Sequence, residues 1–168
     1  MNKTKNIVLS SLFLALAMIL PFLTGQIPEI GSMLCPLHIP ALLAGYFCGW
    51  QYGLIVGAMS PILRSILFSM PPMMAAIPMA FEIATYGAIS GLLYNILPKK
   101  KINIYVSLII AMIAGRGVWG FVKLAMVGFN ISQFGWPMFI SGAFISAIPG
   151  IILQLVLIPV LVLAIKKN

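Results

Sequence analysis

Long runs of uncharged residues dominate the chain. Residues 6–28 and 124–165 contain no acidic or basic side chain, and residues 30–63 contain none except His38. A helix of about 20 predominantly apolar residues crosses a bilayer, so these runs have room for one, about two, and one to two spans. The pattern predicts an integral membrane protein.

Proline, glycine and charged residues divide this apolar pattern, because they interrupt or end helices. The predicted helices cover residues 6–23, 36–49, 52–68, 78–97, 104–127 and 138–165. We therefore predict an all-α fold in which residues 1–168 form a single domain, a bundle of six transmembrane helices. Residues 49–53 are predicted to make a tight turn between the second and third helices.

The lysines predict how the helices are oriented. All except Lys123 lie at residues 3 and 5, at 99–101 and at 166–167, and each of these groups flanks a predicted helix. Cytoplasmic loops of membrane proteins carry an excess of Lys and Arg. Both termini and the 99–101 turn are therefore predicted to be cytoplasmic, which six crossings allow.

The composition supports the same class of protein. Hydrophobic residues make up 62% of the chain and charged residues 7%, whereas about 25% of an ordinary globular chain is charged. The net charge of +8 comes largely from the lysines at helix ends, so a nucleic acid is not an expected partner. Cys35 and Cys48 lie in apolar sequence and are expected to be buried thiols.

Four charged residues lie inside the predicted helices, at Arg64, Glu82, Arg116 and Lys123. A charge near the bilayer centre costs roughly 2.5–3.5 kcal/mol, so such residues usually face the bundle interior or water. Their positions along the helices, and that of His38, place all five in the outward-facing half of the bundle. We expect a binding site there.

The charge balance of these residues points to an anionic ligand. One interpretation pairs Arg64 with Glu82 as a structural contact between the third and fourth helices. Arg116 and Lys123, about 10 Å apart on one face of the fifth helix, are still left without an acidic partner. Gly120 lies between them and leaves space. An anion held by charge-assisted hydrogen bonds would supply the missing negative charge.

Further polar and aromatic residues lie near the same end of the bundle. Tyr86 is one turn from Glu82, and Asn130 lies in the last outward connector with Gln133 and Trp136. We expect Tyr86 and Asn130 to contribute contacts to a ligand. Glu29, in the first outward connector, either reaches over the site or is a solvated loop carboxylate.

The motifs of common enzyme classes are missing from the sequence. It has no G-x-x-x-x-G-K-[ST] phosphate loop, no H-E-x-x-H pattern and one histidine only. We therefore expect a protein that is not an enzyme and that has neither a metal site nor a cofactor.

Nearly the whole chain resembles the substrate-binding S-components of energy-coupling factor (ECF) vitamin transporters, in the branch that includes the pantothenate-type S-components. The stretches that carry the resemblance are MLCPLHIP at residues 33–40, SPILRS at 60–65, MPP at 70–72 and AFEIATYG at 80–87. Ser11 and Ala15 lie where this family has an AxxxA docking motif, with serine in place of the first alanine.

The resemblance implies a prokaryotic plasma-membrane protein that captures a vitamin at the outer face. It also implies a transmembrane coupling (T) subunit and two cytosolic ATPases as partners, with Ser11 and Ala15 at the docking surface. Pantothenate is the favoured substrate because its carboxylate suits an excess of cations, and cobalamin or a folate-like molecule remain open. The alternative function is a non-transporting membrane scaffold or assembly subunit whose charges are structural.

Overall fold

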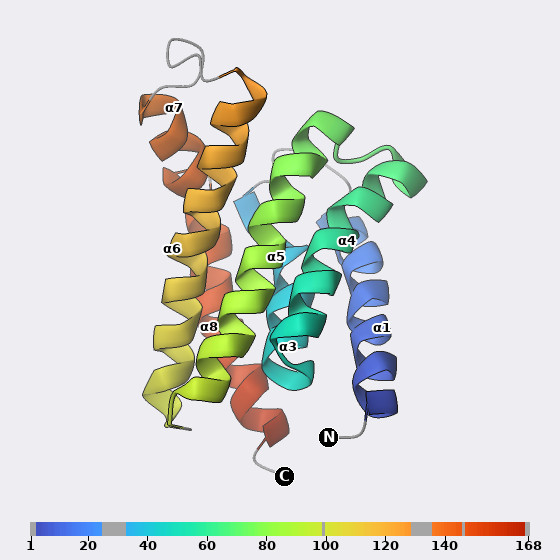
Figure 1. Cartoon of the computed structure of the whole chain (residues 1–168), viewed down its shortest axis with the longest axis vertical. Helices are drawn as coiled ribbons and strands as arrows, with labels where there is room; N and C mark the ends of the chain where they lie inside the picture. Colours follow the sequence, from blue (N-terminus) through green and yellow to red (C-terminus); the bar gives the residue numbers. More distant parts are fainter. Residues whose placement is uncertain (1–2, 25–32, 99, 129–135, 146, 167–168) are drawn as a thin grey trace.

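The computed structural model of the chain describes residues 3–24, 33–98, 100–128, 136–145 and 147–166, and all regular structure in them is helical, as predicted. The elements are α1 (Lys3–Ile19), the 3₁₀ turn η1 (Leu20–Thr24), α3 (His38–Cys48), α4 (Trp50–Phe68), α5 (Met73–Ile96), α6 (Lys101–Met126), α7 (Trp136–Ile140), the π-helical turn η2 (Ser141–Ile145) and α8 (Ile148–Lys166) (Figure 1).

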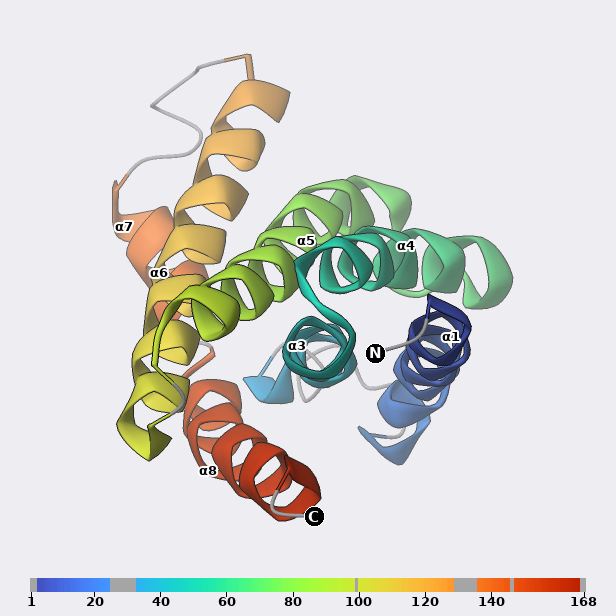
Figure 2. The same ribbon diagram turned by 60° about the horizontal axis from the view of Figure 1, so that its bottom comes forward.

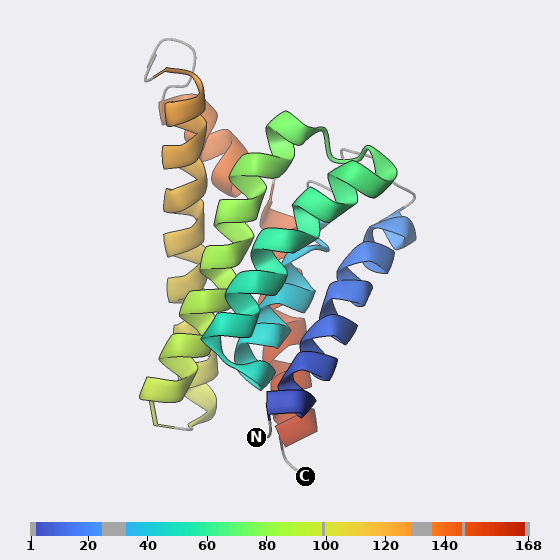
Figure 3. The same ribbon diagram turned by 45° about the vertical axis from the view of Figure 1, so that its right-hand side comes forward.

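The helices form a bundle around α3. This helix packs against α1, α4, α5 and α8, and Figure 2 shows it at the centre of the ring that they make with α6. The helices α1, α3, α4, α5, α6 and α8 run in alternating directions along the chain (Figure 3). The start of α1, the start of α6 and the end of α8 therefore lie at one end of the bundle (Figure 1). That this end is cytoplasmic stays a prediction from the lysine pattern.

Within the residues that the structure describes, five helices are long and apolar enough to cross a membrane, namely α1 with its η1 extension, α4, α5, α6 and α8. The second predicted helix is shorter than the others, because α3 has 11 residues. At 1.5 Å per residue it is about 16 Å long, roughly half the thickness of the hydrocarbon core. Six complete crossings therefore remain a prediction, whereas five candidate spans are observed.

The prediction of one continuous helix over residues 138–165 is wrong. The structure divides it into α7, η2 and α8, and α8 begins at Ile148. Pro149 accounts for the interruption, because its ring clashes with the carbonyl four residues earlier and it has no N–H to donate. In the first turn of α8 both properties are tolerated.

Glycines bring α3, α4 and α5 into backbone contact. A Cβ at Gly53 would meet the backbone of Gly87, and a Cβ at Gly45 would meet the same carbonyl. Small residues at these positions thus serve internal packing, as expected where lipid gives no hydrophobic drive for helix association. Gly49 differs, because it faces open space and its φ of 105° makes the predicted turn between α3 and α4.

Candidate binding site

A buried charged cluster joins three helices near the middle of the bundle. Nη1 of Arg116, on α6, lies 2.8 Å from Oε1 of Glu82, on α5. Nε2 of His38, the first residue of α3, lies 3.4 Å from the same oxygen. The exposed fractions are 1% for Glu82, 2% for His38 and 6% for Arg116. Sequence reasoning named these three residues, and the structure brings them together.

The small residue beside Arg116 explains how α6 comes this close to α5. A Cβ at Gly115 would meet the ring of Tyr86 and the carbonyl oxygen of Glu82. Any larger residue at position 115 would push the two helices apart. The neighbouring guanidinium can therefore reach the carboxylate directly.

Two more side chains border the cluster. The ring of Tyr86, one turn after Glu82 on α5, lies 4.9 Å from the ring of His38, centroid to centroid. Nη2 of Arg116 donates to the sulfur of Cys35 at 3.8 Å. Tyr86 was predicted as a site residue, whereas Cys35 was expected only to be a buried thiol, which it is.

The hydrogen-bonding capacity of the cluster is not filled. Among the residues that the structure describes, both ring nitrogens of His38, Nε of Arg116 and Oε1 of Glu82 have no well-directed hydrogen bond. Buried polar atoms in native proteins are normally paired with protein or with water. Several such atoms in one place mark a site where a polar ligand or water completes the bonding.

Arg64 is not part of this cluster, and its predicted pairing with Glu82 is wrong. Its Nη1 donates to the carbonyl oxygen of Met18 at 2.6 Å, and its guanidinium lies 5.0 Å and 5.2 Å from the ring centroids of Phe22 and Phe68. The reason is the direction that this part of α4 faces, toward α1 and η1 rather than toward α5. Arg64 is a packing residue that joins these elements.

The shared space predicted between Arg116 and Lys123 is also absent. The ring of Phe139, from α7, covers Gly120, so this glycine accommodates a side chain of the protein itself. Nζ of Lys123 lies 5.8 Å from the ring centroid of Trp119, one turn earlier on α6. Arg116 has Glu82 as its acidic partner. One of the two cations that were predicted to lack an acidic partner therefore has one.

Two residues of the predicted site region, Asn130 and Glu29, lie outside the residues that the structure describes. Asn130 stays a predicted contact residue on the strength of the sequence alone.

Gln154 on α8 is a buried polar residue that the sequence analysis overlooked. Its exposed fraction is 1%, and among the described residues its Oε1 has no hydrogen-bond partner. It lies on the inner face of α8 with Ile158 and Val162, one turn after Gly150, which is set against the backbone of residues 33–34. A single amide within the apolar run from 148 to 165 was the available signal.

The chain matches the model of one known protein family. A family model described as "ECF transporter, substrate-specific component" matches residues 5–162, which include every residue of the buried cluster. No curated protein and no solved structure matches the chain. Proteins of the matched family are transport subunits rather than enzymes, and they associate with the T and ATPase components of the ECF module. The chain, with its several apolar helices, belongs to the family of substrate-specific components of ECF transporters.

Proposed function

We propose that this protein captures a small nutrient in the cell membrane and that the substrate binds at the cluster of His38, Glu82 and Arg116. The observation that carries the proposal is a buried ion pair with unfilled hydrogen-bonding positions, held between three helices of a transport subunit. Tyr86 and Cys35 border the same place. Charge-assisted hydrogen bonds in such a dry site are stronger than neutral ones.

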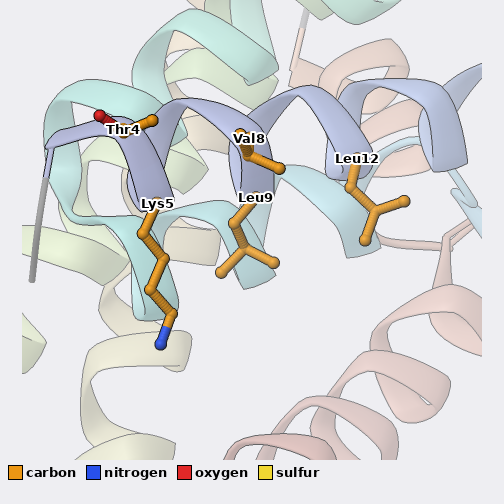
Figure 4. Close-up of a pocket in the computed structure, with 5 residues that line it drawn as sticks. All are labelled: Thr4, Lys5, Val8, Leu9 and Leu12. Atoms are coloured by element: carbon orange, nitrogen blue, oxygen red, sulfur yellow. The ribbon is translucent and has the colours of Figure 1, made fainter.

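The face of α1 that points away from the bundle supports a docking role for this helix. Ser11 and Ala15 are both exposed there. Along the same helix Thr4, Lys5, Val8, Leu9 and Leu12 line an open hollow of about 500 Å³ (Figure 4). We infer that the coupling subunit docks on α1 and that two ATPase subunits complete the transporter.

The substrate is the finer part of the proposal. An anionic vitamin, with pantothenate favoured, was predicted because two cations lacked an acidic partner. With Glu82 beside Arg116, the carboxylate of pantothenate has to compete with Glu82 for that arginine. We keep pantothenate as the first ligand to test, and cobalamin and folate-like molecules as the next.

The proposed site is tested by comparing two buried arginines. We expect Arg116→Gln to weaken binding of the substrate about ten- to hundred-fold, the equivalent of about 1.5–3 kcal/mol for a lost charge-assisted hydrogen bond. Arg64→Gln is the matched control, because Arg64 is also buried but its guanidinium interacts with Met18, Phe22 and Phe68 and not with the cluster. It should lower the melting temperature and leave the affinity unchanged.

The measurement is mass spectrometry of small molecules that copurify with the detergent-solubilised protein, followed by calorimetric titration of the two variants with the molecule identified. Equal affinities for both variants would place the binding site elsewhere. A protein that retains no small molecule and binds none of the tested vitamins would favour the scaffold function instead.

A further inference from the structure

We propose that the group bound beside the Glu82–Arg116 pair is uncharged and carries an N–H or O–H donor next to an acceptor, as a carboxamide does. We further propose that Gln154 is one of the residues that select it. This inference rests on the proposed function and names the chemical class of its substrate.

The first argument is the charge of the cluster. It holds one carboxylate and one guanidinium at 2.8 Å, which compensate each other. A ligand carboxylate would add a second negative charge to a single Arg116, in a place where Glu82 is 1% exposed. Burying a charge without a partner of its own is costly, whereas an uncharged group leaves the balance unchanged.

The second argument is the kind of hydrogen bond that is missing. Among the described residues, Oε1 of Gln154 is a buried acceptor without a hydrogen-bond partner, and Nε of Arg116 is a buried donor without one. Oε1 of Glu82 lies 2.8 Å from Nη1 of Arg116 but has no well-directed hydrogen bond, so it has room for a further donor. A ligand carboxylate has no donor to offer to either oxygen. A carboxamide or a similar N–H and C=O edge supplies both kinds of group.

The third argument is the position of Gln154. α8 packs against α3 and α6, the helices that carry His38 and Arg116. Gly150, one turn earlier on the same face, is set against the backbone of residues 33–34, just before Cys35, whose thiol contacts Arg116. Gln154 therefore lies on the face of α8 that points into the bundle, where α8 packs against the helices that carry His38 and Arg116.

The ligand class is tested with pairs of vitamins. In each pair, one member has a carboxylate at the position where the other has an uncharged group. The pairs are panthenol with pantothenate, nicotinamide with nicotinate, and biotinamide with biotin. Each compound is titrated into the purified full chain in detergent while the melting temperature is followed. We expect an uncharged member to raise the melting temperature at a concentration at least ten-fold lower than its carboxylate counterpart.

Each outcome decides between the two proposals. Preferential stabilisation by a carboxylate member, lost in Arg116→Gln, would overturn the ligand class and leave the binding function standing. No stabilisation by any uncharged member would also overturn the ligand class. If in addition no small molecule copurifies with the protein, the proposed function fails as well.

The role of Gln154 is tested with Gln154→Leu. We expect at least a ten-fold loss of affinity for the stabilising member of the panel. The melting temperature without ligand should be unchanged or higher, because a buried acceptor without a partner is removed. Ile158→Val, one turn later on the same face, is the control and should lower the melting temperature without changing the affinity. A lower melting temperature with unchanged affinity in Gln154→Leu would show that Gln154 is purely structural.

Discussion

At the scale of single residues, the function of each buried charge depends on what it faces. Arg64 and Arg116 are both almost completely buried, on α4 and α6. Arg64 donates to a carbonyl oxygen and lies against two phenylalanine rings, so it needs no other ligand. Arg116 pairs with the carboxylate of Glu82 and donates to the thiol of Cys35. Among the described residues, its Nε, Oε1 of Glu82 and both ring nitrogens of His38 have no well-directed hydrogen bond.

The ion pair predicts that Glu82 and Arg116 are energetically coupled. Glu82→Gln and Arg116→Gln should each destabilise the unliganded protein by about 3–5 kcal/mol, because each leaves the partner charge buried and alone. The double variant should be much less destabilised than the sum of the two. Thermal unfolding of the three variants in detergent measures this coupling, and additive effects would show that the two side chains do not interact.

The sequence was sufficient to find these residues but not to pair them. Glu82 and Arg116 were named because charges inside apolar helices are rare and easily recognised. Their pairing depends on how each helix is rotated about its axis, which hydropathy does not determine when apolar residues occur all round a helix. Gln154 was missed for a related reason, since an uncharged amide barely alters the apolar pattern of α8.

At the scale of elements, close contact between helices depends on individual glycines. Gly87 on α5 lies against the backbone of Gly53 on α4, whereas Gly117 on α6 has no atom within 4 Å of where a Cβ would be. Gly87 therefore permits close contact between two helices and Gly117 does not, although both lie within helices.

Alanine substitutions separate these two contributions. Gly87→Ala should destabilise the protein by about 1–3 kcal/mol or more, because its Cβ would force α4 and α5 apart. Gly117→Ala should be neutral or stabilise the helix by about 0.5–1 kcal/mol, because alanine has the higher helix propensity. Melting temperatures in detergent decide the matter, and equal effects of the two substitutions would contradict the observed packing.

The helix boundaries show what Pro and Gly can and cannot reveal. The break at Gly49 was predicted correctly and α4 ends at Phe68 as expected, but the turn predicted over residues 49–53 is confined to Gly49, because α4 begins at Trp50. The sequence predicts a helix that starts at Pro78. In the structure, α5 begins at Met73 and accommodates this proline in its second turn. Proline is tolerated only at some positions of a helix, and tertiary packing decides which of the allowed boundaries is used.

At the scale of the whole molecule, α1 is attached differently from the other long helices. It packs against α3 and α4 through one face that includes Phe13 and Ala17, while Ser11 and Ala15 on the other face are exposed. The proposed substrate site lies among α3, α5 and α6, so the proposed docking surface and the proposed binding site are on separate parts of the bundle.

This separation predicts that the two activities can be uncoupled. Ala15→Trp should abolish transport by the assembled complex, because a large side chain blocks close approach of another helix. Binding of the substrate to the isolated protein should persist at the affinity of the unmodified protein. Uptake by cells that contain the coupling and ATPase subunits, together with calorimetric titration of the isolated protein, measures both. Equal loss of uptake and of binding would mean that Ala15 supports the fold.

The glycine contacts among α3, α4 and α5 also have a mechanical consequence. Sliding one of these helices along another would bring a side chain to a place where only a backbone without Cβ fits. We expect the three helices to move as one rigid body when the substrate enters or leaves. Gly115 holds α6 against α5 in the same way, so α6 moves with them. The change of shape then falls to α8, which supplies Gln154, so that access to the site is controlled by displacing one side of the bundle while the other stays fixed.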